Sequence, residues 1–198
     1  MEKLYIALVD GTGIFASIIK KAIKLEYCHV VLSLDKDFTK AYSFNRRNPS
    51  IPLIAGFVHE NTQKILRAFP DTTYKIISIS CTNEQKENIR QELEKYYKKR
   101  FRYHYCIIGL PFILWNKPFY QKNHYTCSSF TAKLLSENDL HLFAKHFSLV
   151  TPKDFFELQE AQVEYEGKLY DYIKNEDISE NVRGNKPILK RLISILDN

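Results

Sequence analysis

The stretch Tyr125-Thr126-Cys127-Ser128-Ser129-Phe130-Thr131-Ala132-Lys133-Leu134-Leu135 decides how this chain is interpreted. It places a cysteine between an extended segment and the apolar start of a helix that we expect to run to about Ser136. The first turn of a helix presents unpaired backbone N–H groups, whose partial positive charge favours a thiolate over a thiol. Cys127 is therefore a candidate nucleophile, although the same pattern also fits a small buried core residue.

Composition indicates one globular domain. The chain has 198 residues, of which 44% are hydrophobic and 14% aromatic, enough to bury a full core. We expect a catalytic domain over 1–174 and an amphipathic tail over 175–198. The first ten residues do not resemble a signal peptide, and no apolar run approaches the roughly 20 residues of a membrane span, so we expect a cytoplasmic protein.

The cysteine spacing and the net charge limit which kinds of site the protein is expected to have. The four cysteines lie far apart with no C-x-x-C pair, which fits neither a zinc site nor a dithiol redox motif and predicts free thiols: Cys28, Cys81, Cys106 and Cys127. The net charge of +6 comes with lysine clusters that we interpret as solvated faces rather than a nucleic-acid site. An anionic lipid surface stays open as an alternative partner for these clusters.

Periodicity predicts an α+β fold. The strands expected from β-branched and apolar runs are 5–10, 28–35, 39–44, 51–58 and 74–81, and the expected helices are 14–25, 82–99, 127–136 and a short piece over 141–146. A capping box at Thr82 begins the second helix, and Thr151-Pro152 marks a further helix start. Residues 164–173 have a mixed pattern.

A histidine lies early in the chain on the second expected strand. Alternation puts Val30 and Leu32 on one apolar face and His29 on the other. The strand over 39–44 is expected to pair with this one as a hairpin, so one of its side chains can lie beside the His29 ring. Ser43 is the candidate for that position.

The segment 101–123 is crowded with aromatic residues and is interrupted by Gly109, Pro111 and Pro118. Neither helical nor strand periodicity persists, so we expect an ordered loop that forms an aromatic wall of a cleft next to Cys127. The residues expected to contribute to substrate binding are Tyr125, Tyr42, Gly109 and Trp115.

Several segments together resemble a known family. His29 with a paired strand after it, Tyr103-His104-Tyr105 followed by Gly109-Leu110, and Tyr125-Thr126-Cys127-Ser128 opening a helix look like the permuted NlpC-type cysteine hydrolases of the YiiX/YebB-like group. The segments 41–46, 56–60 and 151–154 are also similar to parts of such proteins. The resemblance covers roughly residues 4–170, and the order of histidine before cysteine is its most specific feature.

The resemblance implies a papain-like α+β fold, with a mainly antiparallel sheet packed against helices. It also implies that Cys127 is the nucleophile, His29 the base and a residue at or near Ser43 the group that orients the imidazole. The chain departs from the pattern where several relatives have an acid in place of Ser43 and a glutamate in place of Ser129. It departs again at Cys106, where relatives often have Asp or Asn after the tyrosine.

These residues would act as a cysteine hydrolase that needs neither a metal nor a cofactor. A nearby imidazolium and a helix N-terminus lower the pKa of a thiol from about 8.5, and the thiolate attacks an acyl carbonyl. His124 is a less suitable base, because three extended residues displace it about 10 Å from Cys127 and turn it to the opposite face. The other histidines lack metal-ligand spacing.

Three functions stay open. The first is hydrolysis of a peptide, an isopeptide or an amide-containing small molecule. The second is thioester chemistry on a lipid acyl chain, as in lipid-acting members of the wider superfamily, and the aromatic segment 101–120 favours it. The third is a non-catalytic binding module that keeps the fold and attracts acidic partners through its lysines. The substrate and the oligomeric state are not determined by the sequence.

Overall fold

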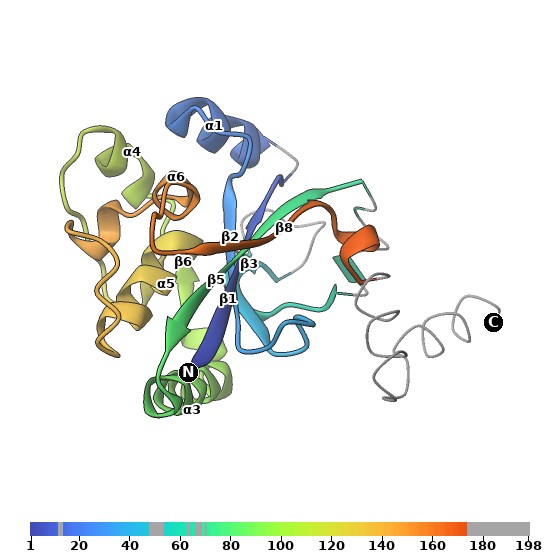
Figure 1. Ribbon diagram of the computed structural model, residues 1–198. Helices are drawn as coiled ribbons and strands as arrows, with labels where there is room; N and C mark the ends of the chain where they lie inside the picture. Colours follow the sequence, from blue (N-terminus) through green and yellow to red (C-terminus); the bar gives the residue numbers. More distant parts are fainter. Residues whose placement is uncertain (12–13, 48–53, 63, 66–68, 70, 174–198) are drawn as a thin grey trace.

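The computed structural model describes residues 1–11, 14–47, 54–62, 64–65, 69 and 71–173 (Figure 1). The strands are β1 (Glu2–Val9), β2 (His29–Ser33), β3 (Ala41–Arg46), β4 (Ala55–His59), β5 (Thr73–Cys81), β6 (His104–Tyr105), β7 (His124–Tyr125) and β8 (Gln162–Lys168). The described ranges contain the α-helices α1 (Ile14–Ile23), α3 (Asn83–Lys98), α4 (Gly109–Leu114), α5 (Cys127–Ser136) and α6 (Pro152–Phe156). The expected tail over 175–198 lies outside the described residues.

All eight strands belong to one mixed sheet, with the order β7-β6-β4-β3-β2-β1-β5-β8. Every neighbouring pair is antiparallel except β6 and β7, which are parallel. The α+β class and the mainly antiparallel sheet expected from the sequence are therefore confirmed.

The central strand explains how the sheet is covered on both faces. β1 lies between β2 and β5, and its successive side chains enter two different clusters of buried residues. Leu4 and Ile6 join the larger cluster, while Ala7 and Val9 join the smaller one. A strand buried on both faces has a continuous run of apolar residues rather than an alternating pattern, and the sequence of β1 has such a run.

The larger cluster holds the helices that carry the site. Phe130 of α5 packs against Phe44 and Phe57 of the sheet, with ring centroids 5.0 and 5.1 Å apart. α3 adds Ile89 and Leu93, both fully buried, and begins at the predicted capping box of Thr82 and Gln85. Figure 1 shows α4, α5 and α6 gathered on one side of the sheet.

The expected hairpin is present. β2 and β3 are antiparallel, with Leu32 opposite Tyr42 and Ser33 opposite Ala41. Val30 and Leu32 enter the larger cluster and Val31 the smaller one, so His29 does lie off the purely apolar face.

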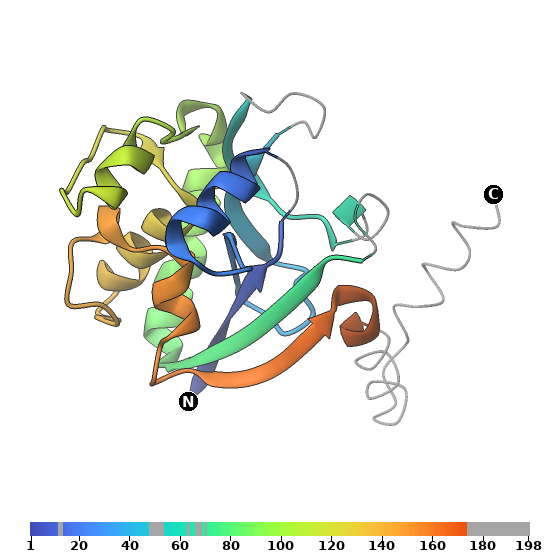
Figure 2. The same ribbon diagram turned by 90° about the horizontal axis from the view of Figure 1, so that it is seen from above.

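Three expectations differ from the structure. Residues 101–123 contain the helix α4 rather than only loop, and the short helical piece expected over 141–146 is replaced by a 3₁₀ turn at Phe147–Leu149. The mixed pattern over 164–173 did not predict β8. This strand pairs with β5 and runs beside it (Figure 2). β8 is an edge strand, so pairing with β5 defines it more than its own largely polar sequence does.

Within the described residues, no helix combines the length and the apolar character needed to cross a membrane.

Candidate active site

Cys127 is the first residue of α5, and only 2% of its surface is exposed. The helix begins there because Thr126 caps it: the Thr126 hydroxyl accepts from the backbone N–H of Ser129 at 3.1 Å, and the Ser129 hydroxyl accepts from the N–H of Thr126 at 2.9 Å. This reciprocal arrangement is a capping box in which serine takes the usual place of Glu or Gln. Ser129 thus helps to set the start of α5 at Cys127.

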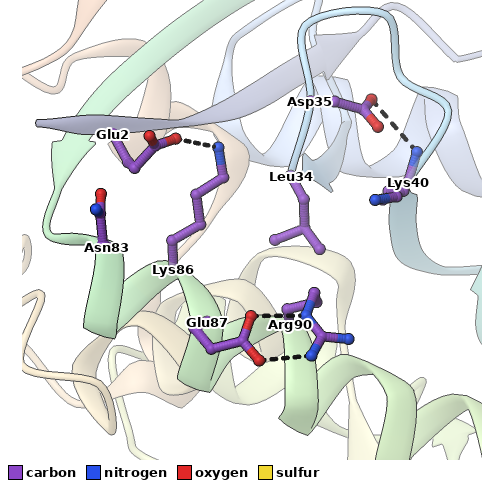
Figure 3. A pocket seen from close by; sticks show the side chains of 8 residues that line it. All are labelled: Glu2, Leu34, Asp35, Lys40, Asn83, Lys86, Glu87 and Arg90. Atoms are coloured by element: carbon purple, nitrogen blue, oxygen red, sulfur yellow. Dashed lines mark hydrogen bonds and ion pairs between the residues drawn. The ribbon is translucent and has the colours of Figure 1, made fainter.

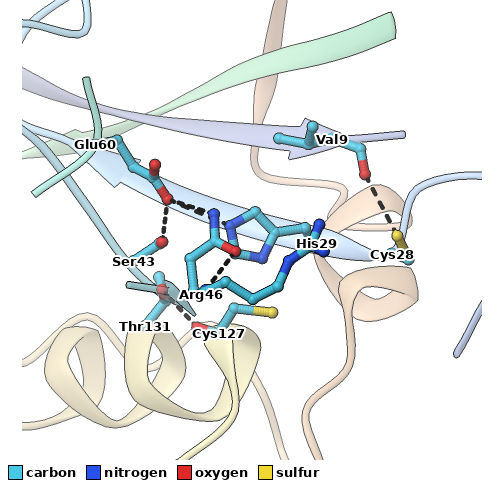
Figure 4. Close-up of polar contacts among 9 residues, drawn as sticks. Val9, Cys28, His29, Ser43, Arg46, Glu60, Cys127 and Thr131 are labelled. Carbon is cyan, nitrogen blue, oxygen red and sulfur yellow. Dashed lines mark hydrogen bonds and ion pairs between the residues drawn. The ribbon is translucent and has the colours of Figure 1, made fainter. Parts of the chain in front are cut away.

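His29 is the first residue of β2, and its side chain is 16% exposed. Figure 4 shows its ring between Glu60 and Cys127. Nε2 faces the Glu60 carboxylate, with 3.6 Å between Nε2 and Oε1, which leaves Nδ1 on the side of the thiol. This distance exceeds a hydrogen bond, and Nε2 is buried without a hydrogen-bond partner, so the contact with Glu60 is an ion pair when the ring is protonated.

The thiol and the imidazole shift each other's pKa. Burial of the Cys127 sulfur opposes ionisation, but the positive charge of His29 and the backbone N–H groups of Val30 and Ser128 outweigh it, so the pKa of Cys127 is lowered. Burial also opposes protonation of His29, yet the Cys127 thiolate and the Glu60 carboxylate raise the pKa of His29 to about 10. The two charges therefore stabilise each other, which favours the thiolate–imidazolium form over the neutral pair.

Glu60 is the carboxylate of the site, and it was not among the predicted site residues. It follows β4 directly and is 8% exposed. Burial raises its pKa, but the charge of His29 and hydrogen bonds from Ser43 and Asn45 give a net lowering. Glu60 therefore stays ionised beside the imidazole.

Ser43 was expected next to His29 as its orienting group, and the structure places it one step further away. It is fully buried, and its hydroxyl donates to Glu60 Oε1, as does the Asn45 side chain at 3.1 Å. The reason is register: continuing the pairing of Leu32 with Tyr42 brings Asn45, not Ser43, level with His29. Ser43 therefore holds the carboxylate that faces the ring.

Tyr105 also lies at the site, and it was not among the predicted site residues. Burial, followed by the negative charge of the Cys127 sulfur and a hydrogen bond to it, raises the pKa of Tyr105 well above its usual value. The phenol is thus a neutral donor facing the Cys127 sulfur. The sequence contains a pattern that could have identified Tyr105, because the alternation of Tyr103, His104 and Tyr105 predicts a strand whose tyrosines share a face.

The four residues expected to bind substrate have different surroundings. Tyr125 is buried beneath the site, where its ring packs against Phe44 with centroids 5.4 Å apart. Tyr42 is also buried and stacks on Phe57 at 5.8 Å, on the part of the sheet that faces α3. Both residues therefore contribute to the core.

Gly109 and Trp115 lie at the two ends of α4. Gly109 is buried, and a Cβ there would meet the Cys106 sulfur at 2.9 Å, so the glycine allows close packing. Trp115 is 65% exposed and touches Phe112 edge-on, with ring centroids 5.8 Å apart. Of the four predicted residues, Trp115 is the exposed one.

The other titratable candidates are engaged elsewhere. His124 Nδ1 donates to the backbone carbonyl of Lys122, 2.9 Å away, and the His124 ring lies beside that of His104. All four cysteines are free, and burial raises the pKa of Cys28, Cys81 and Cys106. The described part of the chain contains no group of three His, Cys, Asp or Glu side chains that could hold a metal ion.

A surface cavity of about 300 Å³ lies near the start of α3 (Figure 3). Lys86 pairs there with Glu2 at 2.8 Å, and Arg90 pairs with Glu87 at 2.5 Å, so both cationic side chains that α3 contributes to the cavity have acidic partners. The cavity touches Leu34 and Asp35, beyond the end of β2 opposite to His29. It does not belong to the cysteine site.

Comparison of the chain with protein-family models, curated proteins and solved structures finds no match.

Proposed function

We propose that this protein is a cysteine hydrolase that cleaves an amide bond in a peptide, an isopeptide or an amide-containing small molecule. One observation carries the proposal: a buried thiol at a helix start faces a histidine, and the two pKa values move in opposite directions. Perturbed titratable pairs of this kind are concentrated at functional sites. The mainly antiparallel sheet with a helix-borne cysteine is compatible with a permuted papain-like fold, which we also propose.

The reaction follows from the positions of the side chains. The Cys127 thiolate attacks the acyl carbon, forming a C–S bond while the carbonyl π electrons move to oxygen. The Tyr105 phenol is positioned to stabilise that oxyanion as a neutral donor. The His29 imidazolium then gives its proton to the leaving nitrogen as the C–N bond breaks, which leaves a thioester and a neutral imidazole.

Water completes the cycle. The neutral His29 accepts a proton from a water molecule, whose oxygen attacks the thioester carbon. The C–S bond then breaks, and the carboxylic acid and the thiolate are released. Glu60 keeps its charge throughout, and its role is to hold the ring and stabilise the imidazolium. We place this activity in the cytoplasm, where the four thiols would stay reduced.

Alkylation of the cysteines against pH tests the proposal. Iodoacetamide labelling of the native protein, read by peptide mass spectrometry, should modify Cys127 at pH 6 much faster than the other three cysteines. His29→Ala should slow Cys127 labelling at that pH by more than about tenfold, because a thiol of ordinary pKa is rarely ionised there.

The three remaining thiols serve as internal controls, since each is buried and has a raised pKa. If Cys127 instead titrates like an ordinary thiol and is indifferent to His29, the hydrolase mechanism is lost and a non-catalytic binding module becomes the better proposal.

A second candidate function is acyl hydrolysis or transfer on a lipid by the same thiolate. The observation that favours it is the exposed apolar helix α4 beside the site, with Ile108, Leu114 and Trp115 all more than 60% exposed. Covalent labelling of Cys127 by an acyl thioester but not by activated peptide amides would favour this candidate.

A further inference from the structure

The segment around α4 is apolar on every side. Residues 106–115, Cys-Ile-Ile-Gly-Leu-Pro-Phe-Ile-Leu-Trp, contain no charged or amide side chain. A surface helix normally keeps one apolar face inward and a polar face outward, and a helix apolar all round is buried or faces lipid. α4 departs from the normal surface pattern.

The outward face of this segment carries large apolar side chains. The exposed fractions are 38% for Ile107, 64% for Ile108, 62% for Leu114, 65% for Trp115 and 46% for Tyr120. Single exposed apolar residues are common on proteins, but several on one short segment indicate an interaction surface. We call Ile107, Ile108, Leu114 and Trp115 the α4 surface.

The inward face is already packed, so the α4 surface cannot turn in. Gly109 lies against the Cys106 sulfur, and the Phe112 ring stacks on Phe119 with centroids 4.6 Å apart. The N–H of Phe119 donates to the Ser148 hydroxyl at 3.2 Å, which ties the segment to the rest of the chain. The exposed residues are therefore held outward by contacts behind them.

Charge decides which partner fits. Residues 101–136 contain no aspartate or glutamate. Lys117 and Lys122 are exposed, and the described residues provide neither with an acidic partner. Exposed Trp, Leu and Ile beside unpaired lysines are the composition of a segment that lies in the interface of an anionic membrane.

Both ends of the segment lead into the cysteine site. It leaves from Tyr105, which faces the Cys127 sulfur, and returns through Tyr125, two residues before Cys127. β6 and β7 are paired there, with Tyr105 opposite Tyr125. A surface that bound the α4 segment would therefore hold the site close to it.

We propose that the α4 surface docks on an anionic lipid bilayer, with Ile108, Leu114 and Trp115 entering the interface and Lys117 and Lys122 meeting the headgroups. The docking itself requires no catalysis. If the proposed hydrolase acts there, its substrates are anchored in or near lipid.

Trp115 is the single tryptophan of the chain, so its fluorescence reports this surface alone. With the full-length protein, vesicles of phosphatidylglycerol should shift Trp115 emission to the blue and co-sediment the protein, whereas phosphatidylcholine vesicles should do so weakly. The double variant Ile108→Ser/Leu114→Ser keeps the reporter and should weaken vesicle binding by roughly tenfold or more. Lys117→Glu/Lys122→Glu should weaken binding to anionic vesicles selectively.

The matched control is Val163→Ser/Tyr170→Ser, which removes two exposed apolar side chains, each 53% exposed, from another part of the molecule and should leave vesicle binding unchanged. Vesicle binding without a change in Trp115 emission would overturn the proposal, because another segment would then bind the lipid. Concentration-dependent self-association in sedimentation velocity that the Ile108→Ser/Leu114→Ser variant abolishes would also overturn it, in favour of a second copy of the chain.

Failure of this proposal is distinguishable from failure of the proposed hydrolase. Cys127→Ala should leave vesicle binding intact, and Ile108→Ser/Leu114→Ser should leave the alkylation rate of Cys127 at pH 6 unchanged.

Discussion

At the scale of single residues, the site consists of groups that would each be costly to bury alone. A buried thiolate, imidazolium or carboxylate without a partner is strongly disfavoured, whereas opposite charges in contact stabilise one another. Cys127, His29 and Glu60 form an alternating series of negative, positive and negative charge, and Ser43 and Asn45 hydrogen-bond to its outer end.

Glu60→Gln tests the outer member of that series. Removing the carboxylate charge should lower the pKa of His29, reduce the imidazolium that holds the thiolate, and slow alkylation of Cys127 at pH 6. The control is Glu164→Gln, because Glu164 also accepts from a serine, Ser78 at 2.6 Å, and pairs with a cation, Lys3 at 2.7 Å, but lies on β8. Equal alkylation rates in the two variants would remove Glu60 from the proposed mechanism.

Tyr105→Phe tests the phenol that faces the sulfur. A hydrogen bond to a charged group contributes about 1.5–3 kcal/mol, so its loss should leave fewer thiolates and slow Cys127 alkylation at pH 6 by about tenfold. Tyr103→Phe is the control, since Tyr103 lies two residues earlier and packs its ring on Tyr96 at 4.7 Å. A faster or unchanged rate in Tyr105→Phe would show that the phenol does not stabilise the thiolate.

At the scale of elements, two features position Cys127 and His29. The capping box of Thr126 and Ser129 sets the first turn of α5, and the hairpin of β2 and β3 brings His29 to the same end of the sheet as Asn45. Gly56 allows β4 to lie close to the start of β6, because a Cβ at Gly56 would come within 2.2 Å of the Tyr103 carbonyl oxygen.

Thr126→Ala should destabilise the protein by about 1 kcal/mol, because a helix-capping hydroxyl is lost. A chain of this size should then melt about 2–4 °C lower. Thr126→Ser, which keeps the hydroxyl, should retain most of the stability. Thermal unfolding followed by circular dichroism measures both variants, and equal melting temperatures for the alanine and serine variants would contradict the role of the cap.

At the scale of the whole molecule, the ion pair contributes to stability over a defined pH window. The lowered pKa of Cys127 contributes stability that is present above its unfolded value of 9.0 and is lost as the pH falls through its lower folded pKa. The raised pKa of His29 contributes stability that is present below its unfolded value of 6.5 and is lost as the pH rises to about 10. The pair therefore loses its contribution on both sides of the range in which the thiolate and the imidazolium coexist.

Urea denaturation against pH tests this window. The difference in free energy of unfolding between the native protein and Cys127→Ala should shrink as the pH falls through the lowered folded pKa of Cys127, and should shrink again as the pH rises past about 10, where His29 loses its proton. A difference that does not change with pH below 9.0 would mean that Cys127 stays a neutral thiol in the folded protein.

Local structure could be predicted from the order of the residues. Apolar runs placed β1 and β5, the capping threonines placed α3 and α6, and alternation put His29 off the apolar face. These features could be predicted because they depend on neighbours within a few residues, where hydrogen bonding and side-chain direction follow spacing. The α+β class followed from the same signals, and β8 was missed because an edge strand draws its stability from its partner.

The groups that meet at the thiol could not be predicted in this way, because they come from distant parts of the chain. Glu60 is 67 residues from Cys127 in sequence, and Tyr105 reaches the sulfur through a two-residue strand paired to β4 and β7. Register sets these contacts, and a shift of one residue would turn each side chain to the other face of the sheet. The same packing decided that Tyr42 and Tyr125 are core residues while Trp115 is exposed, because burial depends on what lies opposite a side chain in space.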